Sequence, residues 1–318
     1  MTNKTKPKIL SELSQIAKEK LDLVPAWVAN NYPNFQECDY QVMEGGCMAL
    51  VVNVGDKIIL KILVAKYDWM ENSPSRAKIP FNYQRLSNSG FDIGQLGILR
   101  IDLQDRIFDC GVVVTQFISN SQPLANLFYQ MTTPEQKNII SKVVIQLKNF
   151  NQPVDLEYNT QELLDSFDER FETAKDRLGS LDKAFFESIR DSFKPLIINH
   201  TYLVHEDVHL ENILIDDVGE MHFIDYDFCR IAPVFLELDT IFLFCFYPTV
   251  TVAEELEVFY QEPMVEVFEQ FVLEYPELWN NKYLPAIKLI FATEILNKYP
   301  HQKFQNNTIF AIQYLKTL

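Results

Sequence analysis

Residues 203–227 read LVHEDVHLENILIDDVGEMHFIDYD, and this stretch decides the fold of the chain. A polar segment holds Asp207 and Asn212, and two short β-like runs, ILID and MHFID, follow it. Asp217-Val-Gly219 separates the two runs and has residue types that are typical of a turn. The pattern predicts a loop followed by a hairpin, and the hairpin returns Asp225 to the neighbourhood of the loop.

The same stretch contains His205-Glu206-x-x-His209, which matches the H-E-x-x-H pattern of zinc metalloproteases. That interpretation needs the two histidines one turn apart on an extended amphipathic helix, together with a third metal ligand. The β-like run ILID begins only four residues after His209, and no strong candidate for a third ligand follows at a familiar spacing. The flanking sequence therefore disfavours a zinc hydrolase, which we keep as a third interpretation.

Phosphoryl transfer makes better use of the same polar residues. This chemistry needs a carboxylate that orients the acceptor hydroxyl and takes its proton, and oxygen ligands that hold Mg²⁺ against the nucleotide phosphates. Asp207 suits the first task. Asn212 and Asp225 offer hard oxygen ligands, which Mg²⁺ prefers and zinc does not.

VHEDVHLENILID and FIDYD resemble the catalytic loop V-H-G-D-L-H-P-G-N-I-L and the metal-binding I-D-x-D of the aminoglycoside phosphotransferase and choline kinase family, small-molecule relatives of the protein kinases. Upstream, EGGCMALVVNVGDKIILKIL (44–63) resembles the hairpin that covers the nucleotide and the strand that carries the phosphate-binding lysine. GVVVTQFIS (111–119) resembles the strand leading into the hinge, where backbone groups meet the nucleotide base. The resemblance implies an α+β, bilobal, protein-kinase-like fold.

The resemblance also implies a role for individual residues. Asp207 would be the catalytic base, and Asn212 and Asp225 would hold Mg²⁺. Lys61 would pair with the α- and β-phosphates of ATP or GTP. His205 would orient the loop. The remaining nucleotide-binding residues that it implies are Gly45 and Gly46, which let the hairpin approach the phosphates without a Cβ in the way, and Gln116 and Ile118 at the hinge.

The sequence departs from the family pattern near this set. Glu206 stands where family members have glycine, and it adds negative charge beside the site. The helix after the lysine strand normally supplies a glutamate to the lysine, but residues 72–89 contain no acid, so Glu71 serves or the pairing is lost. Glu237 and Asp239 are alternative candidates for a later acid of the family. These departures motivate a second hypothesis, a kinase-like protein that binds a nucleotide or metabolite and transfers nothing.

The expected elements divide the chain near residue 117. MALVVNV and KIILKIL flank Gly55-Asp56 and predict a hairpin, and a helix is expected to begin near Pro74. After Phe117 the periodicity is mainly helical. We therefore expect an N-terminal nucleotide-binding lobe over residues 1–117, and a helical C-terminal lobe over 118–318 that carries the catalytic loop and the acceptor pocket.

The composition of the chain indicates which classes of binding partner are disfavoured. The 318 residues carry a formal net charge of −16, which disfavours binding to nucleic acids and anionic membranes. Five scattered cysteines indicate free thiols in a reducing cytoplasm, and the polar N-terminus has no apolar segment typical of a signal peptide. The most apolar run, residues 241–252, is too short to span a bilayer and predicts a buried helix.

The acceptor is expected to be a small molecule. Residues 231–281 contain ten acids and no lysine or arginine, a field that would attract a cationic acceptor such as an aminoglycoside or an amino alcohol. The same acids also fit a solvated face of helices on an acidic protein. The sequence leaves the acceptor, the choice between ATP and GTP, and the oligomeric state open.

Overall fold

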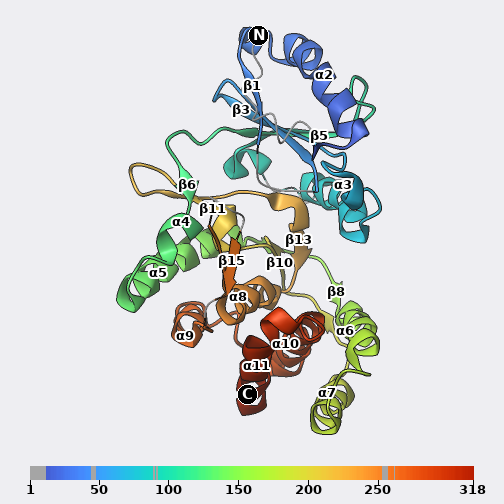
Figure 1. Ribbon diagram of the computed structural model, residues 1–318, viewed down its shortest axis with the longest axis vertical. Coiled ribbons are helices and arrows are strands. Elements are labelled where there is room, and N and C mark those ends of the chain that lie inside the picture. Colours follow the sequence, from blue (N-terminus) through green and yellow to red (C-terminus); the bar gives the residue numbers. More distant parts are fainter. Residues whose placement is uncertain (1–11, 44–47, 89, 91, 253–256, 261) are drawn as a thin grey trace. The chain divides into compact units, whose positions relative to one another are not determined.

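The computed structural model describes residues 12–43, 48–88, 90, 92–252, 257–260 and 262–318 (Figure 1). The chain divides into two compact units, and each is described by itself. Unit 1 comprises Met1–Ser121, Asp216–Val218 and Tyr226–Phe228, and unit 2 comprises Gln122–Ile215, Gly219–Asp225 and Cys229–Leu318. The sequence analysis placed the division after residue 117. Unit 1 runs on to Ser121, because the next two residues pair with a strand of unit 2.

Unit 1 is built on a five-stranded antiparallel sheet with the strand order β1-β2-β3-β5-β4. Its strands are β1 (Tyr40–Val42), β2 (Leu50–Val54), β3 (Ile58–Ile62), β4 (Ile98–Asp105) and β5 (Cys110–Gln116). Its helices are α2 (Gln15–Asn31) and α3 (Pro74–Asn88), so the helix expected to begin near Pro74 is confirmed.

Helix α2 packs on one face of this sheet (Figure 1). Ala17, Val24 and Trp27 of the helix share a buried cluster with Leu60 of β3 and Val112 of β5. Side chains alternate between the two faces of a strand, so the residues between these positions face away from α2. Lys61 is one of them, and it is placed on the opposite face of the sheet by the period of two.

The hairpin expected around Gly55-Asp56 is confirmed as the β2–β3 connection. Three residues connect the strands, and the first two, Gly55 and Asp56, have left-handed φ angles of 57° and 54°, which glycine and aspartate tolerate best. The Asn53 side chain donates to the Asp56 carboxylate at 2.6 Å, which stabilises the left-handed conformation at Asp56. This turn fixes the register that pairs Val51 with Lys61.

Unit 2 is mainly helical. Its helices are α4 (Ala125–Phe128), α5 (Thr133–Phe150), α6 (Gln161–Ala174), α7 (Ser180–Ser192), α8 (Glu237–Phe246), α9 (Val265–Glu274), α10 (Leu284–Lys298) and α11 (Gln305–Thr317). Helix α10 contacts α6, α7, α8 and α11, and α5 contacts α9 (Figure 1). Helix α10 is apolar on most of its circumference because neighbours surround it.

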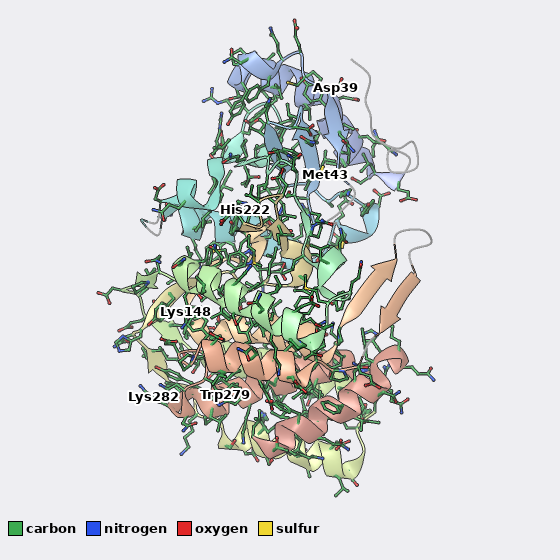
Figure 2. All side chains as sticks on the ribbon, turned by 90° about the vertical axis from the view of Figure 1, so that its left-hand side faces the viewer. Asp39, Met43, Lys148, His222, Trp279 and Lys282 are labelled. Atoms are coloured by element: carbon green, nitrogen blue, oxygen red, sulfur yellow. The ribbon has the colours of Figure 1, made fainter. Side chains whose placement is uncertain are left out.

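Stacked and edge-on phenylalanine rings fill the core of unit 2. The Phe242 ring of α8 stacks on Phe291 of α10, with ring centroids 4.2 Å apart, and on Phe246 at 4.4 Å. Phe268 of α9 meets the Phe291 ring edge-on, and Trp279, labelled in Figure 2, meets Phe268 in the same way. These contacts tie three helices to one another.

Short strands interrupt the helices of unit 2 and carry the loops of interest. They are β6 (Gln122–Pro123), β7 (Pro153–Val154), β8 (Tyr158–Asn159), β9 (Ile197–Ile198), β10 (Thr201–Val204), β11 (Ile213–Ile215), β12 (Met221–Phe223), β13 (Arg230–Ala232), β14 (Thr249–Val252) and β15 (Glu257–Tyr260). β10 lies between β7 and β13, and β11 lies between β6 and β12. The predicted hairpin of residues 213–223 is therefore confirmed as β11–β12.

The apolar run of residues 241–252 is only partly a helix, so the prediction of a single buried helix there is wrong. Helix α8 ends at Phe246, and Thr249–Val252 forms strand β14. Pro248 explains the break, because proline disfavours the helical conformation of the residue before it and cannot continue the helix hydrogen bonds. In the described part of the chain, no helix is both long and apolar enough to cross a membrane.

Candidate active site

The polar loop of the deciding stretch lies between β10 and β11 in unit 2. β10 ends at Val204, and a 3-10 turn, η4 (Leu210–Asn212), leads into β11. The side-chain nitrogen of Asn212 donates to the backbone oxygen of Asp207 at 3.0 Å and to its carboxylate Oδ2 at 2.8 Å. The structure thus brings together the predicted base and one predicted metal ligand.

The zinc hydrolase interpretation is wrong. Residues 205–209 form no helix, so the two histidines are not presented one turn apart. Among the described residues, no group of three or more His, Cys, Asp or Glu side chains could hold a metal ion. His209 instead lies beside the predicted base, with its Nε2 atom 3.7 Å from Asp207 Oδ2, and burial lowers its pKa.

His205 is buried at the start of the loop. Its Nε2 atom lies 3.0 Å from the carbonyl oxygen of Ile224, so this nitrogen carries the ring proton and donates a hydrogen bond to the carbonyl. Burial lowers the pKa of His205 to about 4, and the nearby Asp225 carboxylate opposes that effect. The neutral ring packs against Phe150 and Phe223. It therefore ties the loop to the residue that precedes Asp225.

Glu237 supports the backbone of the loop from the first turn of α8. Its Oε1 atom accepts from the backbone N–H of His205 at 2.7 Å, and its Oε2 atom accepts from that of Glu206 at 3.0 Å. Asn151, at the end of α5, donates to the same Oε1 atom at 2.8 Å. Burial raises the pKa of Glu237 to about 7, although all three hydrogen bonds favour the carboxylate.

Of the two acids that the sequence left as alternatives, Glu237 is the one that contacts the loop. The neighbouring Thr240 reinforces the contact, because its hydroxyl donates to the carbonyl oxygen of Glu206 at 2.9 Å. The sequence offered Glu237 as one of two candidates, and it contained no signal for Thr240. The loop and α8 are separated along the chain by a hairpin and a strand, and folding brings them together.

The extra charge of Glu206 is neutralised within unit 2. Arg230 of β13 forms short ion pairs with the Glu206 carboxylate, and it also pairs with Glu162 of α6 at 2.7 Å. The backbone of Glu206 has a φ of 59°, a conformation that glycine adopts without penalty. The position where the family has glycine therefore keeps the left-handed backbone here, and it carries a paired acid.

Lys61 of β3 has an acid partner within unit 1. Its Nζ atom lies 2.6 Å from Oδ1 of Asp227, and the two side chains are only 12% and 3% exposed. Asp227 belongs to the short segment Tyr226–Phe228, a 3-10 turn (η5) that forms part of unit 1. Glu71, the partner that the sequence offered, is exposed beside α3. The acid that pairs with Lys61 therefore comes from the segment after β12.

Two residues of α3 hold Asp227 in turn. The hydroxyl of Tyr83 donates to Oδ1 of Asp227 at 3.0 Å, and the side-chain amide of Asn82 donates to its backbone oxygen at 2.7 Å. Neither residue could be identified from the sequence, because neither tyrosine nor asparagine has a recognised role at this place in the pattern. Their spacing from Pro74 carries no signal of its own.

The other predicted nucleotide-binding residues are only partly described. Gly45 and Gly46 lie outside the described residues. The backbone N–H of Gln116 donates to the carbonyl oxygen of Gly97 at 2.8 Å, and the Ser121 hydroxyl donates to the carbonyl oxygen of Ile118 at 2.8 Å. Two of the backbone groups at the expected hinge thus already have partners inside unit 1.

The sequence profile of the Ecdysteroid kinase-like family matches residues 124–272, which include the loop, the β11–β12 hairpin and α8. A comparison with curated protein sequences found no significant match.

Several solved structures resemble the whole chain at low sequence identity. Choline kinase LicA from Streptococcus pneumoniae is 14% identical, with 94% of this chain and 100% of that chain covered and a TM-score of 0.54. A choline/ethanolamine kinase family protein from Mesorhizobium loti is 14% identical, with 94% of each chain covered and a TM-score of 0.51. Wild-type aminoglycoside 2′-phosphotransferase-IIIa, solved as its GDP complex, is 11% identical, with 94% and 98% covered and a TM-score of 0.55. The predicted α+β, protein-kinase-like fold is confirmed.

Proposed function

We propose that this chain, which has the protein-kinase-like fold of choline kinases and aminoglycoside phosphotransferases, transfers the γ-phosphate of a nucleoside triphosphate to a hydroxyl group of a small molecule. The observation that carries the proposal is the pairing of Asp207 with Asn212 in a loop whose backbone is held by Glu237. A buried carboxylate that accepts hydrogen bonds from the backbone of a loop restricts the motion of that loop. Catalysis of phosphoryl transfer depends mainly on such positioning of the reacting groups and on electrostatic stabilisation.

In this proposal Asp207 accepts the proton of the acceptor hydroxyl as that oxygen attacks the γ-phosphorus. The bond from the γ-phosphorus to the bridging oxygen breaks, and the nucleoside diphosphate leaves. The Asn212 amide donates to Oδ2 of the Asp207 carboxylate and so fixes the orientation of the group that receives the proton. Lys61 pairs with the α- and β-phosphates, as the motif implies.

Asn212 and Asp225 would hold Mg²⁺. Both hydrogen bonds described for the Asn212 side chain use its nitrogen, so its oxygen is the atom suited to a cation. An amide oxygen and a carboxylate are donors that Mg²⁺ accepts together with phosphate oxygens. When bound, Mg²⁺ neutralises charge on the phosphates and on the developing transition state.

The proposal of a cationic acceptor rests on the ten acids of residues 231–281, and the structure shows how several of them are used. Two acids of that run, Glu266 and Glu277, form exposed ion pairs with Lys137 and Lys148, as expected for a solvated face. Lys148 is labelled in Figure 2. Asp239 differs, because its Oδ1 atom is buried and has no hydrogen-bond partner in the described structure. Burial and the carboxylate of Glu294 raise the pKa of Asp239, whereas Arg230 and Lys298 lower it, so this buried acid already interacts with cations of the chain.

The catalytically silent alternative loses much of its motivation. It rested on the charge of Glu206 and on the missing helix acid beside Lys61. Arg230 neutralises the first, and Asp227 supplies an acid for the second. Neither departure therefore deprives the proposed reaction of a charge that it needs.

Nucleotide consumption with candidate acceptors tests the proposal. Purified protein with Mg·ATP, and separately with Mg·GTP, is combined with aminoglycosides, choline and ethanolamine as cationic acceptors and with an ecdysteroid as a neutral one. We expect turnover with a cationic acceptor, and a fall in kcat of about 10³-fold or more for Asp207→Asn.

A matched variant controls for indirect effects of removing a carboxylate. Asp217 lies in the turn of the β11–β12 hairpin, is exposed, and bonds only to the Asn120 side chain among the described contacts. Asp217→Asn should leave kcat unchanged. Equal turnover by wild type and Asp207→Asn would contradict the proposal, and nucleotide binding without turnover on any acceptor would favour the silent binder.

A further inference from the structure

Helix α3 carries no acid, yet it is linked to Lys61. Residues 72–89 contain neither aspartate nor glutamate. The link runs through Asp227, whose Oδ1 atom accepts from both Lys61 at 2.6 Å and Tyr83 at 3.0 Å. All three residues belong to unit 1, and so does Asn82, which holds the backbone of Asp227.

Asp227 and Tyr83 are both almost completely buried, which restricts the positions that their side chains can take. The Asp227 side chain is 3% exposed, and Tyr83 is 2% exposed. A buried carboxylate must have its hydrogen bonds satisfied, so each of the neighbours that donates to Asp227 restricts where its charge lies. Asn82 fixes the main chain of the residue, and Tyr83 fixes the position of its Oδ1 atom.

Tyr83 also affects Lys61 through the charge of Asp227, because both residues donate to the same carboxylate oxygen. A carboxylate oxygen that accepts from a tyrosine hydroxyl has part of its negative charge neutralised by that hydrogen bond. Asp227 can then orient the ammonium group of Lys61 while leaving more of its positive charge for a second anion. Phosphate oxygens of a nucleotide are the anions that the proposed function brings to this lysine.

We propose that Tyr83 and Asn82 are positioning residues, which hold Asp227 against Lys61 and thereby replace a carboxylate on α3. The inference rests on the proposed function, because it assigns Lys61 to a nucleotide. Neither residue touches the nucleotide in this scheme. Both act on nucleotide affinity through Asp227 and Lys61.

A double-mutant cycle tests this route. The dissociation constant of ADP is measured by calorimetry for wild type, Tyr83→Phe, Lys61→Met and the double variant. Tyr83→Phe removes one hydroxyl and keeps the buried ring, so the chain should fold. We expect the dissociation constant to rise about 5- to 10-fold in Tyr83→Phe, less than the full contribution of one hydrogen bond to a charged group, because the effect reaches ADP only through Lys61. In the Lys61→Met background the same substitution should change it by less than about twofold, because the route through Lys61 is gone.

Tyr40→Phe is the matched control. Tyr40 is also buried in unit 1, and its hydroxyl donates to a backbone carbonyl, that of Gln36, at 3.3 Å. This variant should bind ADP as wild type does. If Tyr83→Phe weakens ADP equally with and without Lys61, the residue is a structural clamp and the inference is overturned.

The outcomes separate this inference from the proposed function. Wild type that binds ADP with an affinity unaltered in Tyr83→Phe overturns the inference alone. Wild type that binds no nucleotide overturns the proposed function and this inference with it. Asn82→Ala provides a second variant, and we expect it to weaken ADP binding in the same Lys61-dependent way.

Discussion

At the scale of single residues, Glu206 shows how a departure from a motif is accommodated. A left-handed backbone costs a residue other than glycine about 1 to 2 kcal/mol, and Glu206 adopts one with a φ of 59°. The Glu237 carboxylate and the Thr240 hydroxyl bind the N–H and the carbonyl of Glu206, and Arg230 pairs with its carboxylate. These contacts offset the backbone cost, so the loop tolerates glutamate at a position suited to glycine.

His205 gives a pH dependence whose sign follows from its environment. Its folded-state pKa is about 4, against roughly 6.5 in an unfolded chain. The unfolded chain therefore binds more protons between these values, and the stability due to the neutral ring is complete above pH 6.5 and lost as the pH falls through 4. We expect that loss to be about 3 kcal/mol.

Urea denaturation of wild type and His205→Gln from neutral pH down to about pH 4 measures this effect. Glu237 acts in the opposite direction, because its pKa is raised to about 7 and folding favours its protonated form as the pH falls. Both proteins contain Glu237, so the difference between them isolates the histidine. The difference in the free energy of unfolding between wild type and His205→Gln should become smaller as the pH is lowered. A difference that stays constant with pH would refute the prediction.

At the scale of elements, turn chemistry positions Lys61. A Cβ atom at Gly55 would lie 2.6 Å from Cβ and Sγ of Cys38, and the φ of Gly55 is 57°. Gly55→Ala should therefore lower the free energy of unfolding by about 2 to 4 kcal/mol, since backbone strain and overpacking add. Chemical denaturation followed by tryptophan fluorescence, to which the buried Trp27 of unit 1 contributes, measures the change.

Gly97→Ala separates the two costs. Gly97 has a φ of 67°, but a Cβ atom there would only reach ordinary contact with the Gln116 side chain at 3.8 Å. It should lose about 1 to 2 kcal/mol from backbone strain alone. Equal losses at the two glycines would show that the contact with Cys38 relaxes without cost.

The break after α8 also belongs to this scale, and the sequence contained its signal. Pro248 divides the apolar run, and Thr249–Val252 alternates threonine with valine, a pattern that favours a strand. The high average hydrophobicity of residues 241–252 outweighed both features in the prediction of a single helix. Local stereochemistry therefore decided the structure where mean hydropathy pointed to a longer helix.

At the scale of the whole molecule, net charge acts on stability. A formal charge of −16 produces self-repulsion in the compact state, and salt screens it. Raising sodium chloride from about 20 to about 200 mM should increase Tm by about 2 to 4 °C, the shift that roughly 1 kcal/mol produces in a chain of this size. Scanning calorimetry measures it, with sucrose of equal osmolarity as the control. An unchanged or lowered Tm in salt would contradict the prediction.

Chain connectivity also matters at this scale. Asp216–Val218 and Tyr226–Phe228 belong to unit 1, although the residues around them belong to unit 2. Asp225 and Asp227 are two positions apart and fall in different units. Asp225 is a proposed metal ligand, and Asp227 pairs with Lys61. One short segment of the chain therefore contributes a proposed functional residue to each unit.

The sequence by itself determined the local features of this protein. The hairpin around Gly55-Asp56, the start of α3 and the loop with its following hairpin depend on turn chemistry and on periods of two or 3.6 residues, which neighbouring residues carry. The resemblance of these motifs, in their order, to those of the aminoglycoside phosphotransferase and choline kinase family implied the protein-kinase-like fold. The roles of Asp207, Asn212 and Asp225 came from the chemistry of phosphoryl transfer and from the same resemblance, and they stay predictions.

Only the tertiary structure decided which charges meet. Lys61 and Asp227 are 166 residues apart, and nothing in their local sequence links them. Arg230 could neutralise Glu206, and Glu237 could support the loop, only after β13 and α8 had packed beside β10. Burial provides the physical reason, because a buried charge must find a partner wherever the packed chain offers one, whatever the separation along the sequence.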